Sequence, residues 1–385
     1  MPSDILNKYQ LAFAEKMSVP FAFGFWKGRV ALYAILKGMG ITENDEVVMP
    51  GYTCVMAVNP IIYLGAKPVF VDIEPVTYNI DPNRIEAAIT PRTRMIIAQH
   101  TYGYPADMNA IMDIAQRHGL PVVEDCCLAL GSRYNGQLAG TFGIAAYFSS
   151  QWNKPYTTGL GGMAVVRDKE LAGRIEQIVE YDLIPPGSRE TTMLRAQLAV
   201  YRSLIYPCTT TLAQNFFRVL TKLGIVVGSS SSEEFGPVME ANFFKGISDL
   251  QAKSGLKQLT RLEQNCAHRK RMTILYEQLL AEKKWPLPTI PSQIDPVLVR
   301  YPVRVADKVK ALQGAARHFV ELGSWFECPL HPIETPMHLY GYYPGMCPQA
   351  DKASAEVVNL PLHPRTSPST IRRSVEYIAG IGPAA

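Results

Sequence analysis

Strand-like and helix-like segments alternate along the first third of the sequence, and this alternation constrains the fold more than any other feature. Short apolar runs are each followed by a segment whose apolar residues have helical spacing. Such alternation predicts a mostly parallel sheet with helices on both faces, in which ligands bind beyond the carboxyl ends of the strands. The predicted strands are 45–49, 68–72, 94–98 and 121–124, and the predicted helices are 55–64, 82–88 and 107–118, the last with Asp107 as its N-cap.

The remainder of the chain predicts a second, smaller domain. A length of 385 residues exceeds what one hydrophobic core usually supports, so we expect a large domain over 1–245 and a small α/β domain over 246–385. Basic, apolar and serine-rich sequence over 183–240 is interpreted as a helical insertion, which could form a lid, an extra packing layer, a subunit contact or a membrane-surface element. The C-terminal part is predicted to contain one long amphipathic helix after Asn242, strands at 297–305 and at Trp325, and helices at 307–322, at 350–358 and from 368.

Composition excludes several function classes. A formal net charge of +4 favours neither nucleic acid nor a membrane surface as the main partner. No apolar run is long enough to span a bilayer, and the N-terminus is typical of a short amphipathic helix, so we expect a cytoplasmic protein. The seven cysteines are odd in number and lack paired C-x-x-C spacing, which predicts reduced thiols, no disulfide framework and no metal site.

Lys154 lies on a glycine-rich turn between two predicted strands, 144–148 and 163–167. Packing can fix the stem of a lysine at such a place, and loss of water lowers its pKa. These are the conditions for a nucleophilic amine, although most lysines after strands are solvated loop residues.

Two further places on the chain have a chemical interpretation. Asp125 ends the apolar run LPVVED, where a buried carboxylate needs a cation or hydrogen-bond donors; capping of the following turn is the alternative. Gly28 begins a predicted helix and Arg29 follows it, a combination that suits a phosphate but also occurs at ordinary helix starts. Other polar side chains that follow strand ends, and that we expect to face the same crevice, are His100, Cys54 and Ser149.

Several long stretches together resemble one family. They include GRVALYAILKGMGITENDEVVMPGYTC, HTYGYPADMNAIMDIAQRHGLPVVEDCCLALGSRYNGQLAGTFG, FSSQWNKPYTTGLGGMAVV, ISDLQAKSGLKQL and VVNLPLHP. The chain resembles the DegT/StrS-type sugar aminotransferases, enzymes of fold type I that depend on pyridoxal 5′-phosphate (PLP). The resemblance covers most of the chain in the same order, apart from the insertion and the extreme N-terminus.

The resemblance implies a role for each of the chemically suggestive residues. Lys154 matches the lysine that forms the Schiff base with PLP, and Asp125 matches the aspartate that pairs with the pyridine nitrogen. Ser149 matches the serine on the cofactor phosphate, and Gly28 with Arg29 occupies the helix start that also binds this phosphate. An anionic Asp125 keeps the pyridinium protonated, so that the ring accepts electrons when a proton leaves the substrate.

The chain also departs from the pattern of its relatives. Leu128 stands where relatives often carry a glutamine, and Cys54 stands where an aromatic ring often stacks on the cofactor. The segment that reaches the partner subunit's phosphate in relatives is replaced by NFFKGIS, so that Lys245 or Arg29 would have to compensate. The insertion over 183–240 is larger than most relatives have.

The resemblance implies a homodimer with shared active sites that moves an amino group from an amino acid, L-glutamate being expected, to a keto sugar, most often nucleotide-linked. Such enzymes serve the biosynthesis of amino sugars and of polysaccharides such as lipopolysaccharide. Trp152 and His331 are expected substrate contacts. Alternative acceptors are an oxidised 3-deoxy-octulosonate and an aminocyclitol precursor. A sugar dehydratase would carry histidine in place of Lys154, and a PLP-binding regulator without turnover is a further alternative.

Overall fold

A computed structural model describes residues 3–152, 154–204 and 233–384 of the chain. Its centre is a seven-stranded sheet with the order β1-β10-β9-β6-β5-β2-β4. The five strands from β9 to β4 run parallel, whereas β10 and β1 are antiparallel to their neighbours. The strands are β1 (Phe21–Phe25), β2 (Glu46–Pro50), β4 (Lys67–Val71), β5 (Thr93–Gln99), β6 (Val122–Asp125), β9 (Ala145–Ser149) and β10 (Gly162–Val166).

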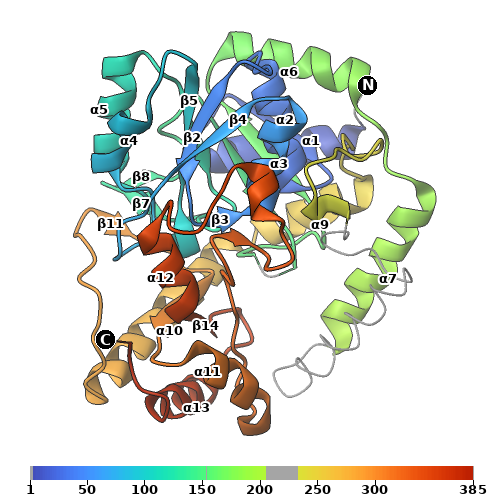
Figure 1. Cartoon of the computed structure of the whole chain (residues 1–385). Helices are drawn as coiled ribbons and strands as arrows, with labels where there is room; N and C mark the ends of the chain where they lie inside the picture. Colours follow the sequence, from blue (N-terminus) through green and yellow to red (C-terminus); the bar gives the residue numbers. More distant parts are fainter. Residues whose placement is uncertain (1–2, 153, 205–232, 385) are drawn as a thin grey trace.

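Helices cover both faces of this sheet, as the alternating pattern predicts (Figure 1). Apolar residues of one face pack against α2, α3 and α6, and those of the other face pack against α1, α4, α5 and α9. Strand β1 was not predicted, because five apolar residues directly before a helix give no alternation of their own. The helices are α1 (Asp4–Met17), α2 (Gly28–Gly38), α3 (Val55–Tyr63), α4 (Pro82–Ala88), α5 (Met108–His118), α6 (Lys169–Asp182) and α9 (Asp249–Leu259).

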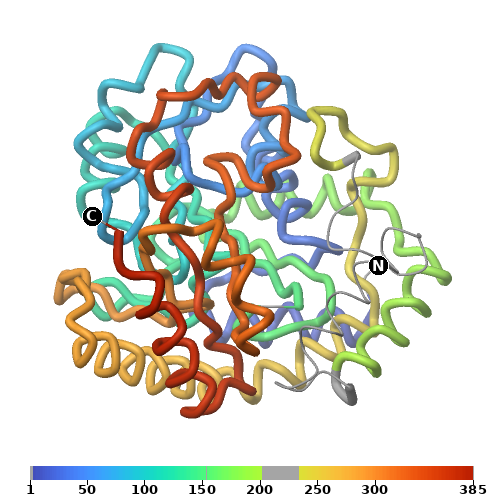
Figure 2. The backbone as a smooth tube through the Cα atoms, turned by 60° about the horizontal axis from the view of Figure 1, so that its bottom comes forward, coloured from blue at the N-terminus to red at the C-terminus, as the bar shows by residue number. Residues whose placement is uncertain are grey.

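The C-terminal part forms a smaller α/β unit around the antiparallel pair β12 (Arg300–Arg304) and β14 (Val357–Pro361). In Figure 2 this part, in orange and red, runs across the front of the view, with blue and green segments of the sheet-bearing part behind it. Its apolar residues join the same buried cluster as α2 and α3, so the two parts share a continuous apolar contact. Its helices are α10 (Leu262–Glu282), α11 (Lys308–Ala315), α12 (Pro348–Glu356) and α13 (Pro368–Ala379).

Short elements complete the described chain. Strand β3 pairs in parallel with β13, and β7, β8 and β11 form a small antiparallel sheet. Their bounds are β3 (Thr53–Cys54), β13 (Leu330–His331), β7 (Arg133–Tyr134), β8 (Gln137–Leu138) and β11 (Ile294–Asp295), with 3-10 turns η1 (Thr101–Gly103), η2 (Glu233–Phe235), η3 (Ala316–His318) and η4 (Met337–Tyr340).

Four predicted elements of the C-terminal part are wrong in extent or type. The long helix predicted after Asn242 is two helices, because α9 buries its apolar side against the sheet and α10 buries Tyr276 and Leu280 in the other cluster. The helix predicted to reach residue 322 ends at Ala315. Trp325 lies outside any strand, and the helix predicted over 350–358 changes into β14 at Val357.

The insertion begins with a helix, as predicted. Helix α7 (Ser188–Leu204) lies at the edge of the molecule in Figure 1 and buries Leu194 and Leu198 against Trp26 and Leu160. Residues 205–232 of the predicted insertion lie outside the described part of the chain. None of the described helices combines the length and the apolarity that crossing a bilayer requires.

Candidate active site

The loop between β9 and β10 holds Lys154 in a fixed turn. The backbone N–H of Lys154 donates to the carbonyl of Gln151 at 3.0 Å, and the Ser150 and Thr158 hydroxyls are 2.7 Å apart across the loop. The Gln251 side-chain amide of α9 also holds the loop, because it donates to the carbonyl of Leu160 at 2.8 Å. Lys154 therefore does not lie on a free surface loop.

The amine of Lys154 lies in the contact between the two parts of the chain. Its Nζ is 5.1 Å from the centre of the Trp325 ring, which belongs to the C-terminal part. Burial lowers the pKa of Lys154, and the nearby Cys127 and Asp125 partly oppose this shift. Lys154 is half-buried, so its amine is partly withdrawn from water, and a lowered pKa increases the fraction of neutral, nucleophilic amine.

Asp125 ends β6 next to this lysine and is 6% exposed. Its Oδ2 accepts a hydrogen bond from the Tyr147 hydroxyl at 2.5 Å, and its Oδ1 accepts one from the Cys127 N–H at 2.9 Å. Tyr147 stands opposite Asp125 in the β6–β9 register. Burial, followed by the charge of Asp125, raises the pKa of Tyr147 well above its usual value, so the phenol stays a donor. Two donors thus hold the carboxylate in place.

The start of α2 lies against the end of β9. A Cβ atom added to Gly28 would lie 3.1 Å from the Ser149 Cβ and 3.2 Å from the Phe148 carbonyl oxygen. Gly28 therefore allows the helix start to approach Ser149 closely. The first N–H groups of a helix have no partner within the helix, and the helix dipole favours an anion there. Gly28 and Ser149, predicted to share a phosphate site, do lie side by side.

The two cationic candidates for that phosphate have carboxylate partners. Arg29 Nη1 is 2.7 Å from Glu234 Oε1, and Lys245 Nζ is 2.6 Å from Glu190 Oε1. Lys245 Nζ also lies 5.8 Å from the centre of the Trp26 ring. Both carboxylates belong to the predicted insertion, and no local pattern in the sequence predicts this connection.

Cys54 and His331 are brought together by two-residue strands. They are register partners in the β3–β13 pair, and the His331 ring is 5.6 Å from the ring of Phe326. Burial lowers the pKa of His331 to about 4, so the imidazole is neutral at physiological pH. Burial raises the pKa of Cys54, while the charges of Arg29 and Lys154 act to lower it.

Trp152 packs toward the insertion. Its ring is 5.0 Å from the Tyr201 ring of α7, and its carbonyl accepts a hydrogen bond from the Tyr201 hydroxyl at 3.0 Å. It also packs with Leu198 and Leu250 in a small apolar cluster. These contacts give Trp152 a packing role, and its predicted contact with substrate stays a prediction.

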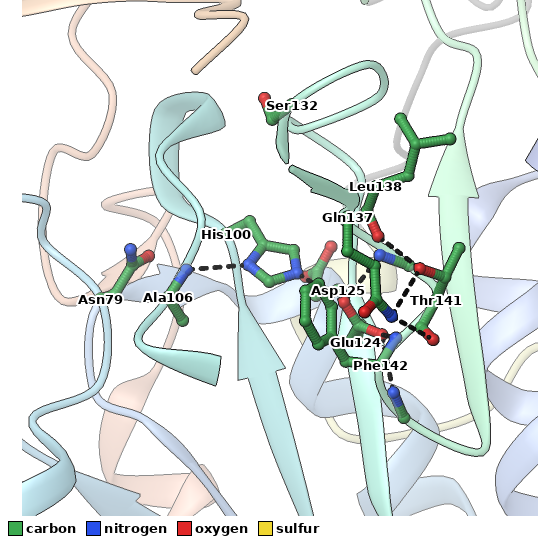
Figure 3. Close-up of polar contacts among 12 residues, drawn as sticks. Asn79, His100, Ala106, Glu124, Asp125, Ser132, Gln137, Leu138, Thr141 and Phe142 are labelled. Carbon is green, nitrogen blue, oxygen red and sulfur yellow. Dashed lines mark hydrogen bonds and ion pairs between the residues drawn. The ribbon is translucent and has the colours of Figure 1, made fainter. Parts of the chain in front are cut away.

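His100 was predicted to face the crevice, and this prediction is wrong. Successive side chains of a strand point to opposite faces, so Glu124 points away from the face of Asp125. There the His100 Nε2 is 3.0 Å from Glu124 Oε2, and the Ala106 N–H donates to His100 Nδ1 at 3.0 Å (Figure 3). Because Nδ1 accepts, the proton of the ring is on Nε2 and points at the carboxylate.

Glu124 organises the loop that follows β8. Its Oε2 also accepts from the Gly140 N–H at 2.6 Å, and its Oε1 accepts from the N–H groups of Phe142 at 2.7 Å and Gly143 at 2.8 Å. Glu124, His100 and Cys126 form the one compact group of possible metal ligands in the described ranges. The hydrogen bonds already engage both carboxylate oxygens and both ring nitrogens, which indicates a structural role.

Three side chains of the site, Tyr147, Trp325 and Arg300, were not predicted as functional residues from the sequence. Tyr147 could have been found from the alternation of β9, which places it on the face of Asp125. Trp325 and its neighbour Arg300, whose Cζ is 5.5 Å from the Trp325 ring centre, come from distant segments. Nothing local in the sequence connects these two residues with Lys154.

The residues present fit PLP. The site contains three groups that this cofactor needs: a lysine with a lowered pKa, a carboxylate held by two donors, and a helix start with a glycine beside Ser149. Lys154 would hold the aldehyde end of the cofactor, Asp125 the ring nitrogen, and the start of α2 with Ser149 the phosphate. Such a site on such a sheet is that of a PLP-dependent transaminase of fold type I.

Comparison with known proteins gives the family. The chain belongs to the DegT/DnrJ/EryC1/StrS aminotransferase family, which matches residues 4–193 and 212–379. It is 29% identical over 376 residues to the GDP-perosamine synthase of Caulobacter vibrioides, covering 96% of this chain and 87% of that protein. It is 32% identical over 312 residues to the L-glutamine:scyllo-inosose aminotransferase of Streptomyces griseus, covering 81% and 65%.

The fold comparison agrees. The structure of S. venezuelae DesV in complex with a ketimine intermediate superimposes with a TM-score of 0.77 at 25% identity, covering 99% of this chain and 90% of that one. The predicted family, the fold class and the dependence on PLP are therefore confirmed, and the chain is a PLP-dependent aminotransferase.

Proposed function

We propose that the enzyme transfers an amino group from L-glutamate or L-glutamine to a nucleotide-linked keto hexose. The observation that carries the assignment of the site is the half-buried amine of Lys154, which lies 5.1 Å from the Trp325 ring centre and has a pKa lowered by burial and raised by the charge of Asp125. Similarity to a GDP-perosamine synthase over nearly the whole chain supports a nucleotide-linked acceptor. Similarity to an L-glutamine-dependent aminotransferase widens the donor from the predicted L-glutamate to both amino acids.

Bound PLP supplies an aldehyde that carries the amino group and a ring that accepts electrons. Asp125 keeps the ring nitrogen protonated, and the Tyr147 and Cys127 donors fix the direction of its carboxylate. In this proposal, Asp125 is the side chain that contacts the ring nitrogen.

Lys154 moves the proton. Burial lowers the pKa of this amine and so favours its neutral form, in which Nζ would take a proton from the substrate carbon and return it to the cofactor. Trp325 covers the side of the amine that faces the C-terminal part and excludes water there.

The start of α2 and Ser149 bind the phosphate in this proposal. Because Gly28 allows α2 to approach Ser149 closely, the backbone N–H groups at the helix start and the Ser149 side chain can bind the same phosphate. The assignment of Cys54 to the cofactor is supported by the charges of Lys154 and Asp125, which act on its thiol. His331 is the register partner of Cys54 across β3 and β13, which supports its assignment to the substrate.

The proposal includes a homodimer with shared active sites, which the family resemblance implies. Light scattering of the purified protein measures this directly. A monomer that turns over at its full rate would contradict shared sites.

Separate half-reactions test the function. The cofactor-loaded enzyme is mixed with L-glutamate or L-glutamine, and the keto acid formed per active site is measured by mass spectrometry. The aminated enzyme is then offered nucleotide-linked 4-keto and 3-keto hexoses, keto-inositols and oxidised sugar acids. We expect one equivalent of keto acid and rapid consumption of a nucleotide-linked acceptor.

Lys154→Ala and Lys257→Ala form a matched pair of variants, because Lys257 is an exposed lysine of α9. The first should abolish both half-reactions, and the second should leave them unchanged. Keto acid formation at the wild-type rate by Lys154→Ala would refute the role of Lys154. A normal donor reaction with turnover of keto-inositols alone would refute the nucleotide-linked acceptor, and no donor reaction at all would favour a regulator.

A further inference from the structure

A buried group of three charges lies at the start of α2. Lys27 and Arg29 flank Gly28, and both contact the carboxylate of Glu234. Glu234 Oε1 is 2.7 Å from Arg29 Nη1 and 3.0 Å from Lys27 Nζ, and its Oε2 is 3.1 Å from the same Nζ. The Glu234 carboxylate thus forms ion pairs with both cations that flank Gly28, the residue at the helix start beside Ser149.

Burial makes these charges interdependent. Arg29 is 5% exposed and Glu234 is 3% exposed. Burial, together with the smaller effect of the Arg29 charge, lowers the pKa of Lys27 to about 8, although Glu234 opposes both effects. Two buried cations two positions apart are costly without an anion, and Glu234 is the anion that the chain itself provides.

Glu234 is held there by its backbone. The Asn59 side-chain amide of α3 donates to the Glu234 carbonyl at 2.7 Å, and the Tyr340 hydroxyl donates to the Phe235 carbonyl at 3.3 Å. The side chain is therefore presented to the helix start by a segment anchored on two sides. The fold itself therefore determines where the Glu234 carboxylate lies.

We propose that Glu234 is a resident counter-anion of the cofactor-phosphate site, which competes with the phosphate of PLP for Lys27 and Arg29. The inference rests on the placement of that phosphate at the start of α2. When the phosphate binds, the two cations turn to it and Glu234 loses its ion pairs. Glu234 is a positioning residue that sets the affinity and the charge selectivity of the cofactor site.

Glu234→Gln tests this proposal, because it keeps the shape of the side chain and removes its charge. The dissociation constants of PLP and of pyridoxal, which lacks the phosphate, are measured by absorbance on cofactor-free protein. We expect the variant to bind PLP about tenfold more tightly and pyridoxal with unchanged affinity. Loss of a merely structural side chain would weaken the binding of both compounds.

Asp182→Asn is the matched control. Asp182 forms an exposed ion pair with Lys37 at the other end of α2, at 2.7 Å. This variant should not change the ratio of the two dissociation constants. A ratio in Glu234→Gln equal to that of the wild type, or shifted toward pyridoxal, would overturn the proposal.

A second measurement uses the wild-type protein and stands if Glu234→Gln does not fold. Hydrogen exchange of residues 233–240 is followed with and without PLP, and with inorganic phosphate. We expect faster exchange at Glu234 and Phe235 when either ligand is bound, because the ion pairs are released. Unchanged or slower exchange there would contradict the proposal.

The outcomes also separate this inference from the proposed function. Protein that binds neither PLP nor pyridoxal would refute the cofactor site itself. Protein that binds PLP and transfers amino groups, but shows no effect of Glu234, would refute only the counter-anion.

Discussion

Replacement of Glu124 by glutamine should destabilise the protein strongly although it leaves every catalytic group in place. The carboxylate accepts four hydrogen bonds, two at each oxygen, from three backbone N–H groups and from His100. A glutamine keeps one oxygen, and its NH₂ group must face two of these donors in either orientation. His100 cannot relieve the conflict by moving its proton, because its Nδ1 accepts from the Ala106 N–H.

The magnitude follows from this count of donors. Two buried N–H groups lose their acceptor, and each loss costs about 1–3 kcal/mol. The free energy of unfolding of Glu124→Gln should therefore fall by about 2–6 kcal/mol. Loss of the carboxylate charge beside its four donors acts in the same direction.

Urea unfolding of the cofactor-loaded protein, followed by circular dichroism, measures this change as a lower midpoint at constant slope. Glu86→Gln is the control, because Glu86 makes its hydrogen bonds to Arg117 and His118 on the exposed surface. We expect the control to keep the wild-type midpoint. If both variants unfold at the same urea concentration, the argument from buried donors is refuted.

Three further predictions concern the site. Asp125→Asn should lower the rate of amino transfer by about 100-fold or more, because the ring nitrogen loses its anion. Stopped-flow rates with wild-type values would contradict the assignment. Gly28→Ala should weaken PLP binding about tenfold, since its Cβ would meet Ser149 at 3.1 Å; equal affinity in an absorbance titration would show that the helix start does not need the close approach. Because the pKa of Lys154 is lowered in the folded, cofactor-free protein, unfolding takes up a proton at pH values between that pKa and the usual value of 10.5. The free energy of unfolding should therefore rise with pH in this window. Lys154→Met should make this rise less steep, and an identical slope of unfolding midpoint against pH in both proteins would refute the prediction.

Much of the fold could be predicted because it depends on local pattern. Strands β2, β4, β5 and β6 and the helices between them follow from runs of apolar residues and from caps such as Asp107, which does accept from the Ala110 N–H at 3.1 Å. The break between α9 and α10 could not, because the spacing of leucines is helical on both sides of it. Only the different surfaces against which the two helices pack make the chain turn there.

Some residues of the site could likewise be predicted from local pattern, and others could not. Lys154 on its turn and Asp125 at its strand end could be recognised as unusual, since a buried charge needs a chemical reason wherever the strand lies. His100 also follows a strand end, but it bonds to Glu124 on the far face of the sheet. Nothing local in the sequence indicated that the adjacent Glu124 is also buried and binds His100, because that depends on how β6 lies between its neighbours.

By itself the sequence determined the residue types of the site and the order of elements that carries them. Tertiary structure decided which charges meet: Glu234, 207 residues from Lys27, neutralises the start of α2, and Trp325 covers the amine of Lys154. The reason is physical. Hydrogen-bond patterns and apolar periodicity act between neighbours in the chain, whereas desolvation and ion pairing depend on distances that exist only after the chain has folded.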